Sequence, residues 1–151
     1  MIVIAIIGIL AAIAIPKFAE LIRKSTEGKS KGNLGALRSA LSIYYSDMEG
    51  YFPTDDLVSL TANGKYINSL PNASAPNYHP DSAQVRTNFA GGAMLGCAGG
   101  YSIDDGKWGY WSDSIGTCAG ATPAGQKSKQ WGDLWMACSH TDSKSSVWTT
   151  Y

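Results

Sequence analysis

The sequence lacks the residue sets that common catalytic sites require. It contains two histidines among 151 residues, and it has no Gly-x-Ser-x-Gly segment, no phosphate-binding glycine loop and no paired-acid motif. Twelve basic and twelve acidic residues give a net charge of zero, so the overall charge does not favour binding to nucleic acid. We therefore expect no catalytic residues, no cofactor and no small-molecule substrate, and a function that depends on surfaces.

Residues that bind metals are too sparse along the chain to predict a metal site. Cys138-x-His140, with His79 far away in sequence, supplies too few donors for a zinc signature. Oxygen ligands for calcium could come from three aspartates of a glycine-rich stretch, Asp104, Asp105 and Asp113. Aspartates in such a stretch more often form turns, so we predict that no metal is bound.

Leucine and isoleucine become scarce after Leu70, where glycine and tryptophan are frequent. All five tryptophans lie between Trp108 and Trp148, and glycine is concentrated between Gly91 and Gly132. This composition predicts short strands and tight turns in place of helices.

The expected strands can be placed by their turn signals. Asp104-Asp105-Gly106-Lys107 separates residues 100–103 from residues 108–111, which predicts a hairpin. Residues 131–139 and 147–151 are the expected third and last strands. We expect these segments to form an antiparallel sheet of about four strands in residues 97–151, with one face that needs a cover.

The first fifteen residues, MIVIAIIGILAAIAI, are apolar or glycine and carry no charge. As a helix they would span roughly 22 Å, which is short for a bilayer core of about 30 Å. The segment suits a membrane, a buried core helix or the core of a signal peptide. A signal peptide is disfavoured because no basic region precedes the segment and no small-residue cleavage site follows it. Gly8 and Pro16 both weaken a helix, so we expect a kink at Pro16 or unwinding between them.

Residues 17–49 continue as a helix with apolar residues at a period near 3.6, and Gly50 is its expected C-terminal cap. The only long element able to cover the sheet is the back half of this helix. We therefore predict an α+β fold, with a long bent N-terminal helix packed on the C-terminal sheet. The expected division is a membrane or filament-core half in residues 1–22 and a head in residues 23–151, made of helix 23–49, loop 50–96 and sheet region 97–151.

Two features of the helix admit alternative interpretations. Residues 17–38 hold six basic and two acidic residues, a collar that suits a membrane surface or an acidic neighbour, or that is a solvated helix face. Gly28 and Gly32 lie four residues apart and form a slim patch, which favours close helix–helix packing or marks a weak solvated turn.

Three cysteines allow one disulfide bond. We favour Cys97–Cys118, because these positions lie at the open ends of the predicted hairpin and face each other. Closing such a loop stabilises a fold by about 3 kcal/mol in the entropy model. Cys138 would then be a buried thiol within a strand, and Cys118–Cys138 is the main rival pairing.

The segment MIVIAIIGILAAIAIPKF, the periodic helix after it and Gly50-Tyr51-Phe52-Pro53-Thr54 resemble bacterial type IV pilins and the related type II secretion pseudopilins. The resemblance covers about fifty residues and is closest to a type IVa-like major pilin. It implies a subunit held in the inner membrane and then assembled with identical subunits into an extracellular helical filament for adhesion or motility. Pilus assembly machinery and a prepilin peptidase are the implied partners.

The family's basic leader, Gly–Phe cleavage site and early glutamate do not precede Met1, so the sequence is expected to start about six residues inside a mature pilin. The expected assembly residues share the apolar helix: Ile2, Ile4, Ile6, Ile7, Gly8, Ile9, Leu10, Ile13, Pro16, Phe18 and Leu21. The alternatives are a pseudopilin of a type II secretion system and a minor tip pilin that binds a ligand or DNA.

Overall fold

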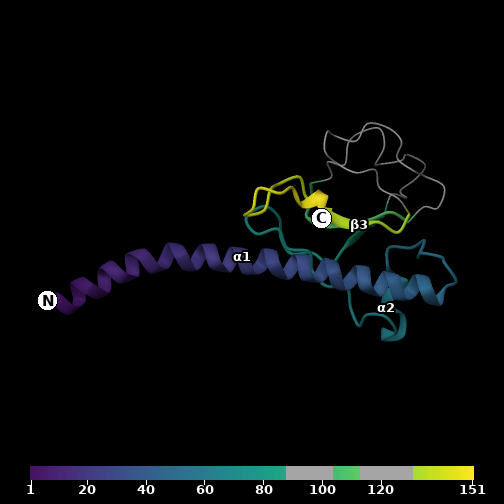
Figure 1. Ribbon diagram of the computed structural model, residues 1–151, viewed down its shortest axis with the longest axis horizontal. Coiled ribbons are helices and arrows are strands. Elements are labelled where there is room, and N and C mark those ends of the chain that lie inside the picture. Colours follow the sequence, from purple (N-terminus) through teal and green to yellow (C-terminus); the bar gives the residue numbers. More distant parts are fainter. Residues whose placement is uncertain (88–103, 113–130) are drawn as a thin grey trace.

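The computed structural model describes residues 1–87, 104–112 and 131–151. One helix dominates it: α1, Ile2–Asp47, is 46 residues long and continues through Pro16. Figure 1 shows its first half projecting from the head and curving away from it, while its second half runs along the head. The predicted bend therefore takes the form of a curve in an intact helix, and residues 8–16 are helical.

Helix α1 ends where the sequence predicts. The Gly50 amide donates a hydrogen bond to the Tyr45 carbonyl oxygen over 2.9 Å, and the Met48 amide donates to the Tyr44 carbonyl over 2.9 Å. Glu49 and Gly50 both have positive φ, at 53° and 95°. This is the left-handed ending that satisfies the last helical carbonyls, and glycine adopts it at no steric cost.

A short segment returns the chain to α1. Helix α2, Val58–Thr61, is followed by the 3-10 turn η1, Ala62–Gly64. The Asp55 carboxylate accepts hydrogen bonds from the amides of Leu57 (3.0 Å) and Ser59 (2.9 Å), so this side chain organises the turn. Leu57 and Leu60 are fully buried and join the core under α1.

The sheet has three strands in the described residues and is mixed. Strand β1, Val85–Thr87, pairs in parallel with β2, Lys107–Tyr110, which pairs in antiparallel with β3, Leu134–Ala137. The predictions for β2 and β3 are confirmed, and the α+β architecture with a long N-terminal helix is confirmed as well. The strand expected in residues 100–103 lies outside the described residues.

Two details of the predicted sheet are wrong. Strand β1 lies in a region that was expected to be loop. Its three residues form a strand because they pair with the free edge of β2. The segment expected as a last strand makes only the single bridge between Thr141 and Val147, and then forms the 3-10 turn η2, Trp148–Thr150. The turn places the Trp148 side chain, 2% exposed, in the core, where a continued strand would alternate its residues between two faces.

The core lies between α1 and the sheet. Leu34, Leu37 and Leu41 of α1 pack in one cluster with Trp108 and Tyr110 of β2. The polar tips of both aromatics are satisfied: the Trp108 indole donates to the Pro71 carbonyl and the Tyr110 hydroxyl donates to the Pro53 carbonyl, each over 2.7 Å. Rings with satisfied tips can be buried completely without the cost of an unpaired donor.

Candidate assembly helix and head surface

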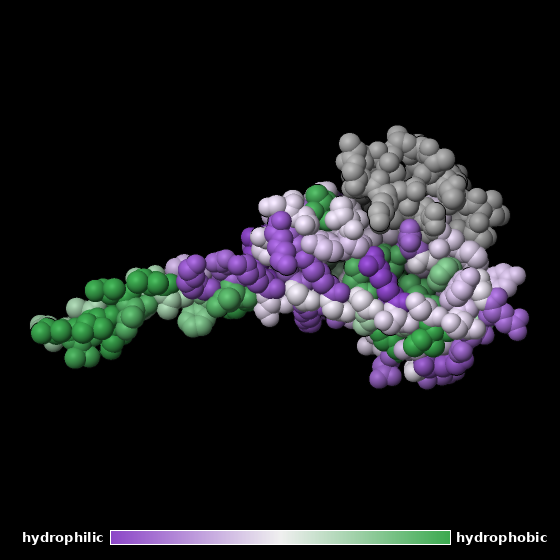
Figure 2. Space-filling model, viewed as in Figure 1, coloured by the Kyte–Doolittle hydropathy of each residue, from purple (hydrophilic) through white to green (hydrophobic). Residues whose placement is uncertain are grey.

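The first half of α1 is apolar and uncovered. By length and composition this helix could cross a membrane, and no part of its most apolar stretch is buried. The exposed fraction of Ile9 is 64% and that of Ile13 is 63%. Figure 2 shows the projecting half as a hydrophobic rod that is separate from the head. A helix that is apolar on all sides must be covered by lipid or by other protein.

All the residues predicted for assembly lie on this rod. Each of them is exposed: Ile2, Ile4, Ile6, Ile7, Gly8, Ile9, Leu10, Ile13, Pro16, Phe18 and Leu21. A Cβ atom added at Gly8 would meet no atom within 4 Å. These residues form a continuous surface that no other segment buries in the part of the chain that the structure describes.

Charged residues begin where the rod ends. Glu20 is 2.6 Å from the Lys24 ammonium and 3.6 Å from that of Lys17, and Figure 2 shows the hydrophilic region that follows the apolar rod. Gly28 and Gly32 are exposed, and a Cβ at either would meet no atom within 4 Å. No described residue therefore covers this small-residue patch.

A buried carboxylate that was not expected from the sequence, Glu27, joins α1 to the loop between β3 and η2, residues 138–147, which we call the C-terminal loop. The Glu27 side chain is 5% exposed; it pairs with Arg23 at 3.1 Å and accepts hydrogen bonds from the Ser143 amide at 3.0 Å and hydroxyl at 2.6 Å. Burial would raise the pKa of Glu27, but the Ser143 hydrogen bonds and the Arg23 charge outweigh it and lower this pKa. The available signal was spacing, since Ser30 and Glu27 extend the stripe of Leu34 and Leu37 by two further helical turns.

Lys31 makes a second junction one turn further along. Its ammonium lies 2.5 Å from the Asp142 carboxylate and 2.8 Å from the Tyr151 hydroxyl. Asp142 also accepts hydrogen bonds from the amides of Lys144 (2.8 Å) and Ser146 (2.9 Å). Burial opposes ionisation of Asp142, yet Lys31 and these donors keep its pKa below the ordinary value. The C-terminal loop is thus held to the helix by ionic hydrogen bonds.

Four side chains with metal-binding atoms meet on another part of the head. Their donor atoms all lie within 4.8 Å of one another, and we call them the donor cluster: His79, Asp104, Cys138 and His140. Asp104 is 2.8 Å from His79 Nε2 and 3.2 Å from His140 Nδ1, and His140 Nδ1 is 3.6 Å from Cys138 Sγ. Cys138, His140 and His79 are the three possible ligands that the sequence suggests together, whereas Asp104 was expected to form a turn.

Ionisation within the donor cluster follows from its contacts. Burial would raise the pKa of Asp104, but hydrogen bonds from Ser139 and His79 and the charge of His140 bring it to about 2. Burial raises the pKa of the Cys138 thiol to about 11, so this thiol carries its proton at neutral pH in the absence of a cation.

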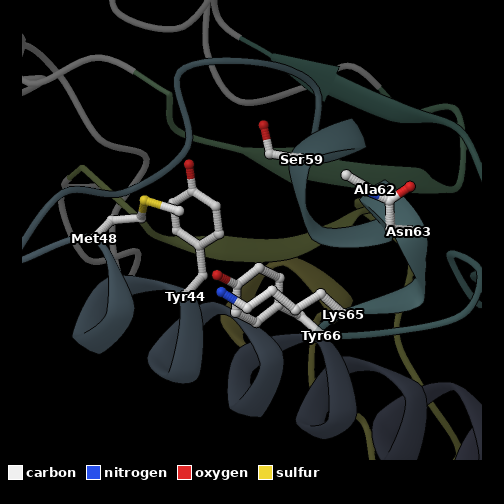
Figure 3. A pocket seen from close by; sticks show the side chains of 7 residues that line it. All are labelled: Tyr44, Met48, Ser59, Ala62, Asn63, Lys65 and Tyr66. Atoms are coloured by element: carbon white, nitrogen blue, oxygen red, sulfur yellow. The ribbon is translucent and has the colours of Figure 1, made fainter.

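An open pocket lies at the far end of α1 (Figure 3). Tyr44 and Met48 of the helix face Ser59 and Ala62 across it, and Tyr66 and Lys65 line its base. Two of its polar groups share one partner next to the pocket: Lys65 is 2.9 Å from the Asp47 carboxylate, and the Tyr66 hydroxyl is 3.1 Å from the same group. The pocket therefore offers apolar and aromatic surface without a convergent set of reactive groups.

The predicted disulfide bond between Cys97 and Cys118 lies outside the described residues and stays a prediction. Cys138 is a free, buried thiol directly after β3.

Comparison with known proteins gives two matches to pilus proteins. Over 73 residues the chain is 45% identical to the fimbrial protein EcpC of Eikenella corrodens, a match that covers 46% of this chain and 47% of EcpC. Over 51 residues it is 49% identical to the type IV major pilin protein PilA of Myxococcus xanthus (strain DK1622), which covers 34% of this chain and 23% of PilA. The matched span is thus about half, or less, of each relative's length.

No family model matches the chain, and no solved structure matches it. The identities of 45–49%, together with a long apolar N-terminal helix joined to an α+β head, support the type IV pilin family for this chain.

Proposed function

We propose that the chain is the major structural subunit of a type IV pilus, polymerising with identical subunits through the apolar half of α1. The observation that carries the proposal is the complete exposure of this half in a single chain. Such a surface is stable in lipid, where a helix satisfies its backbone internally, and in a bundle of equivalent helices. Transfer from the membrane to a filament core keeps it out of water throughout.

The head fits the outer layer of such a filament. In the described residues, its core is formed within one chain by α1, the sheet and the segments that pack between them. Repeated head-to-tail contacts between identical subunits do not close into a ring, and they generate a helical filament. The proposed locations are the inner membrane before assembly and the extracellular pilus afterwards. The proposed role is structural, and adhesion or motility would be properties of the filament.

The names of the relatives favour a pilus over a secretion pseudopilus. EcpC is named a fimbrial protein and PilA a type IV major pilin. A major pilin dominates the filament fraction, whereas a minor tip pilin is scarce in it.

The test is intact mass measurement and N-terminal sequencing of filaments sheared from the cells that produce the protein. We expect this protein as the dominant species, with an N-terminus methylated as in processed pilins. Recovery of the protein from membranes alone, with another pilin forming the filaments, would refute the major-pilin role and favour a pseudopilin or an anchored binding protein.

A further inference from the structure

The donor cluster brings together three segments that are distant in sequence. His79 lies in the loop before β1, Asp104 lies just before β2, and Cys138 and His140 follow β3 directly. Both histidines of the chain are in this cluster. Two rings, a thiol and a carboxylate within 4.8 Å of one another form a mixed set of nitrogen, sulfur and oxygen donors.

The separations between the donor atoms suit tetrahedral coordination. Zinc bonds of about 2.0–2.3 Å place neighbouring ligand atoms roughly 3.3–3.6 Å apart. Two separations are close to this range: 3.6 Å between Cys138 Sγ and His140 Nδ1, and 3.2 Å between His140 Nδ1 and Asp104 Oδ2. The shorter distance of 2.8 Å, between His79 Nε2 and Asp104 Oδ1, is a hydrogen bond, in which a proton occupies the space between two potential ligands.

The surroundings hold these side chains in place. Asp104 accepts hydrogen bonds from the Ser139 amide at 3.0 Å and hydroxyl at 2.9 Å. The His140 ring stacks on Tyr78, with centroids 4.0 Å apart and an interplanar angle of 16°. Outer partners of this kind fix the orientation of metal ligands.

Gly106 leaves the space that His79 occupies. It has a φ of +69°, and a Cβ atom added there would lie 2.4 Å from the His79 Cβ. A side chain at this position would push His79 out of the donor cluster. The backbone of the turn before β2 thus permits the approach of His79 to the other donors.

The donor types select the class of cation. Calcium and magnesium prefer sets made of oxygen ligands, whereas this cluster offers one carboxylate, two imidazoles and a thiol. Imidazole and thiolate ligands in a four-donor set suit zinc, and four protein ligands complete a structural site with no open position. Cys138 is fully buried and the His79 side chain is 12% exposed, whereas the side chains of Asp104 and His140 are 29% and 37% exposed, so the site is shielded from water on its Cys138 side and open on the other.

We propose that the donor cluster binds one zinc ion, which ties three loops of the head together. This departs from the expectation that the sequence carries no metal site, because folding adds Asp104 and brings His79 to the pair after β3. The bound ion replaces the proton between His79 and Asp104 and displaces the proton of the Cys138 thiol. It thereby fixes the loop before β1 to the ends of β2 and β3.

The test is metal titration of the full chain, purified in detergent and stripped of metal. We expect one zinc ion per chain by native mass spectrometry and a higher melting temperature with zinc. Cobalt(II) in place of zinc should show the visible absorption of four-coordinate cobalt and a thiolate-to-cobalt charge-transfer band. Failure of the metal-free wild-type chain to bind stoichiometric zinc would overturn the proposal.

Three variants assign the site. Cys138→Ser should abolish the charge-transfer band, and His140→Gln should weaken zinc binding at least about tenfold. Asp56→Asn, which alters an exposed carboxylate outside the cluster, should leave the charge-transfer band and the zinc affinity unchanged. Circular dichroism checks that each variant folds. If Cys138→Ser does not fold, His140→Gln still decides the test, because the His140 side chain is 37% exposed and its replacement should leave the core intact. Zinc binding of wild-type strength in His140→Gln, or a persisting charge-transfer band in Cys138→Ser, would place the ion elsewhere and refute the proposal.

Discussion

Some positions in the head are limited more by how closely neighbouring side chains approach the backbone than by the residue's own preference for helix or strand. Gly109 lies in the middle of β2, opposite Trp135 of β3, and a Cβ atom added to it would lie 2.4 Å from the Trp135 ring. Gly35, on the exposed face of α1, has no atom within 4 Å of the same position. The two glycines therefore have different physical roles, although the sequence presents both as glycine.

Gly109→Ala should destabilise the protein by about 1–3 kcal/mol, because the Trp135 ring would have to move away from position 109. Gly35→Ala is the matched control and should stabilise the protein by roughly 0.5–1 kcal/mol, since alanine favours a helix. Chemical denaturation of each full chain in detergent, followed by tryptophan fluorescence, measures both changes. Equal effects of the two substitutions would contradict the close packing of Trp135 on β2.

Glu27 makes the stability of the head depend on pH. Its pKa is below the ordinary value of about 4.3 in the folded state, so its contribution is present above that pH and is lost as the pH falls through the lower folded pKa. Glu27→Gln should reduce the free energy of unfolding at pH 7 by about 1.5–3 kcal/mol, the range for hydrogen bonds to a charged group. The difference between variant and wild type should shrink toward pH 3.

The control for this prediction is Glu20→Gln. Glu20 is another ion-paired carboxylate of α1 and lies between Lys17 and Lys24, but its side chain is 49% exposed. Its ion pairs are therefore screened by water, and their loss should lower the free energy of unfolding much less. Denaturation curves between pH 3 and pH 7 compare the two variants. A Glu27→Gln effect that stays the same at both ends of this range would contradict the role of the ionised carboxylate.

At the scale of elements, α1 has two halves that differ in what covers their apolar residues. Its second half buries Leu34, Leu37 and Leu41 within the chain, whereas its first half buries nothing. A charge in the first half is tolerated by an isolated chain in water, but it is costly once the helix lies in lipid or in a packed bundle.

Ile13→Lys should therefore abolish filaments without altering the fold of the head. Ile13→Leu keeps the apolar surface and should assemble normally. Electron microscopy and immunoblotting of sheared filaments measure assembly, and blotting of whole cells checks that both variants accumulate. Normal piliation by Ile13→Lys would exclude the apolar half of α1 from the filament core.

The sequence predicts elements well where one local pattern dominates. The period of apolar residues and the Gly50 ending locate α1, and turn signals beside aromatic residues locate β2 and β3. Strand β1 is a three-residue edge strand defined by its pairing with β2, so it has no pattern of its own. Val147 makes a single bridge before the chain turns inward to bury Trp148, and only the space in the core decides this.

Contacts between distant segments account for what sequence analysis missed in the candidate sites. Glu27 and Ser30 continue the buried stripe of α1, so spacing alone could have indicated that they face the head. The donor cluster gives no such signal, because the residues before β1 and β2 meet those after β3 only when the sheet forms. By contrast, the apolar half of α1 is visible from composition, since its surface belongs to one continuous segment.

At the scale of the whole molecule, the head and the apolar rod are structurally separate. The buried residues of α1 begin at Glu27, and every residue before Arg23 except Ala14 is exposed. The rod is thus attached to the head by the helix backbone and not by packing. Removal of the rod should leave the core, the sheet and both ionic junctions in place.

A chain of residues 23–151 should therefore fold as the full chain does, with the same near-ultraviolet circular dichroism and a melting temperature within a few degrees. It should not bind lipid vesicles, because the surface that needs lipid is gone. Removal of residues 1–33 is the contrasting truncation: it deletes Glu27, Ser30 and Lys31, which hold the C-terminal loop and the segment at Ser74, and it should lower the melting temperature strongly. If both truncations unfold alike, the rod contributes to the stability of the head, and the division of α1 into a filament half and a head half is wrong.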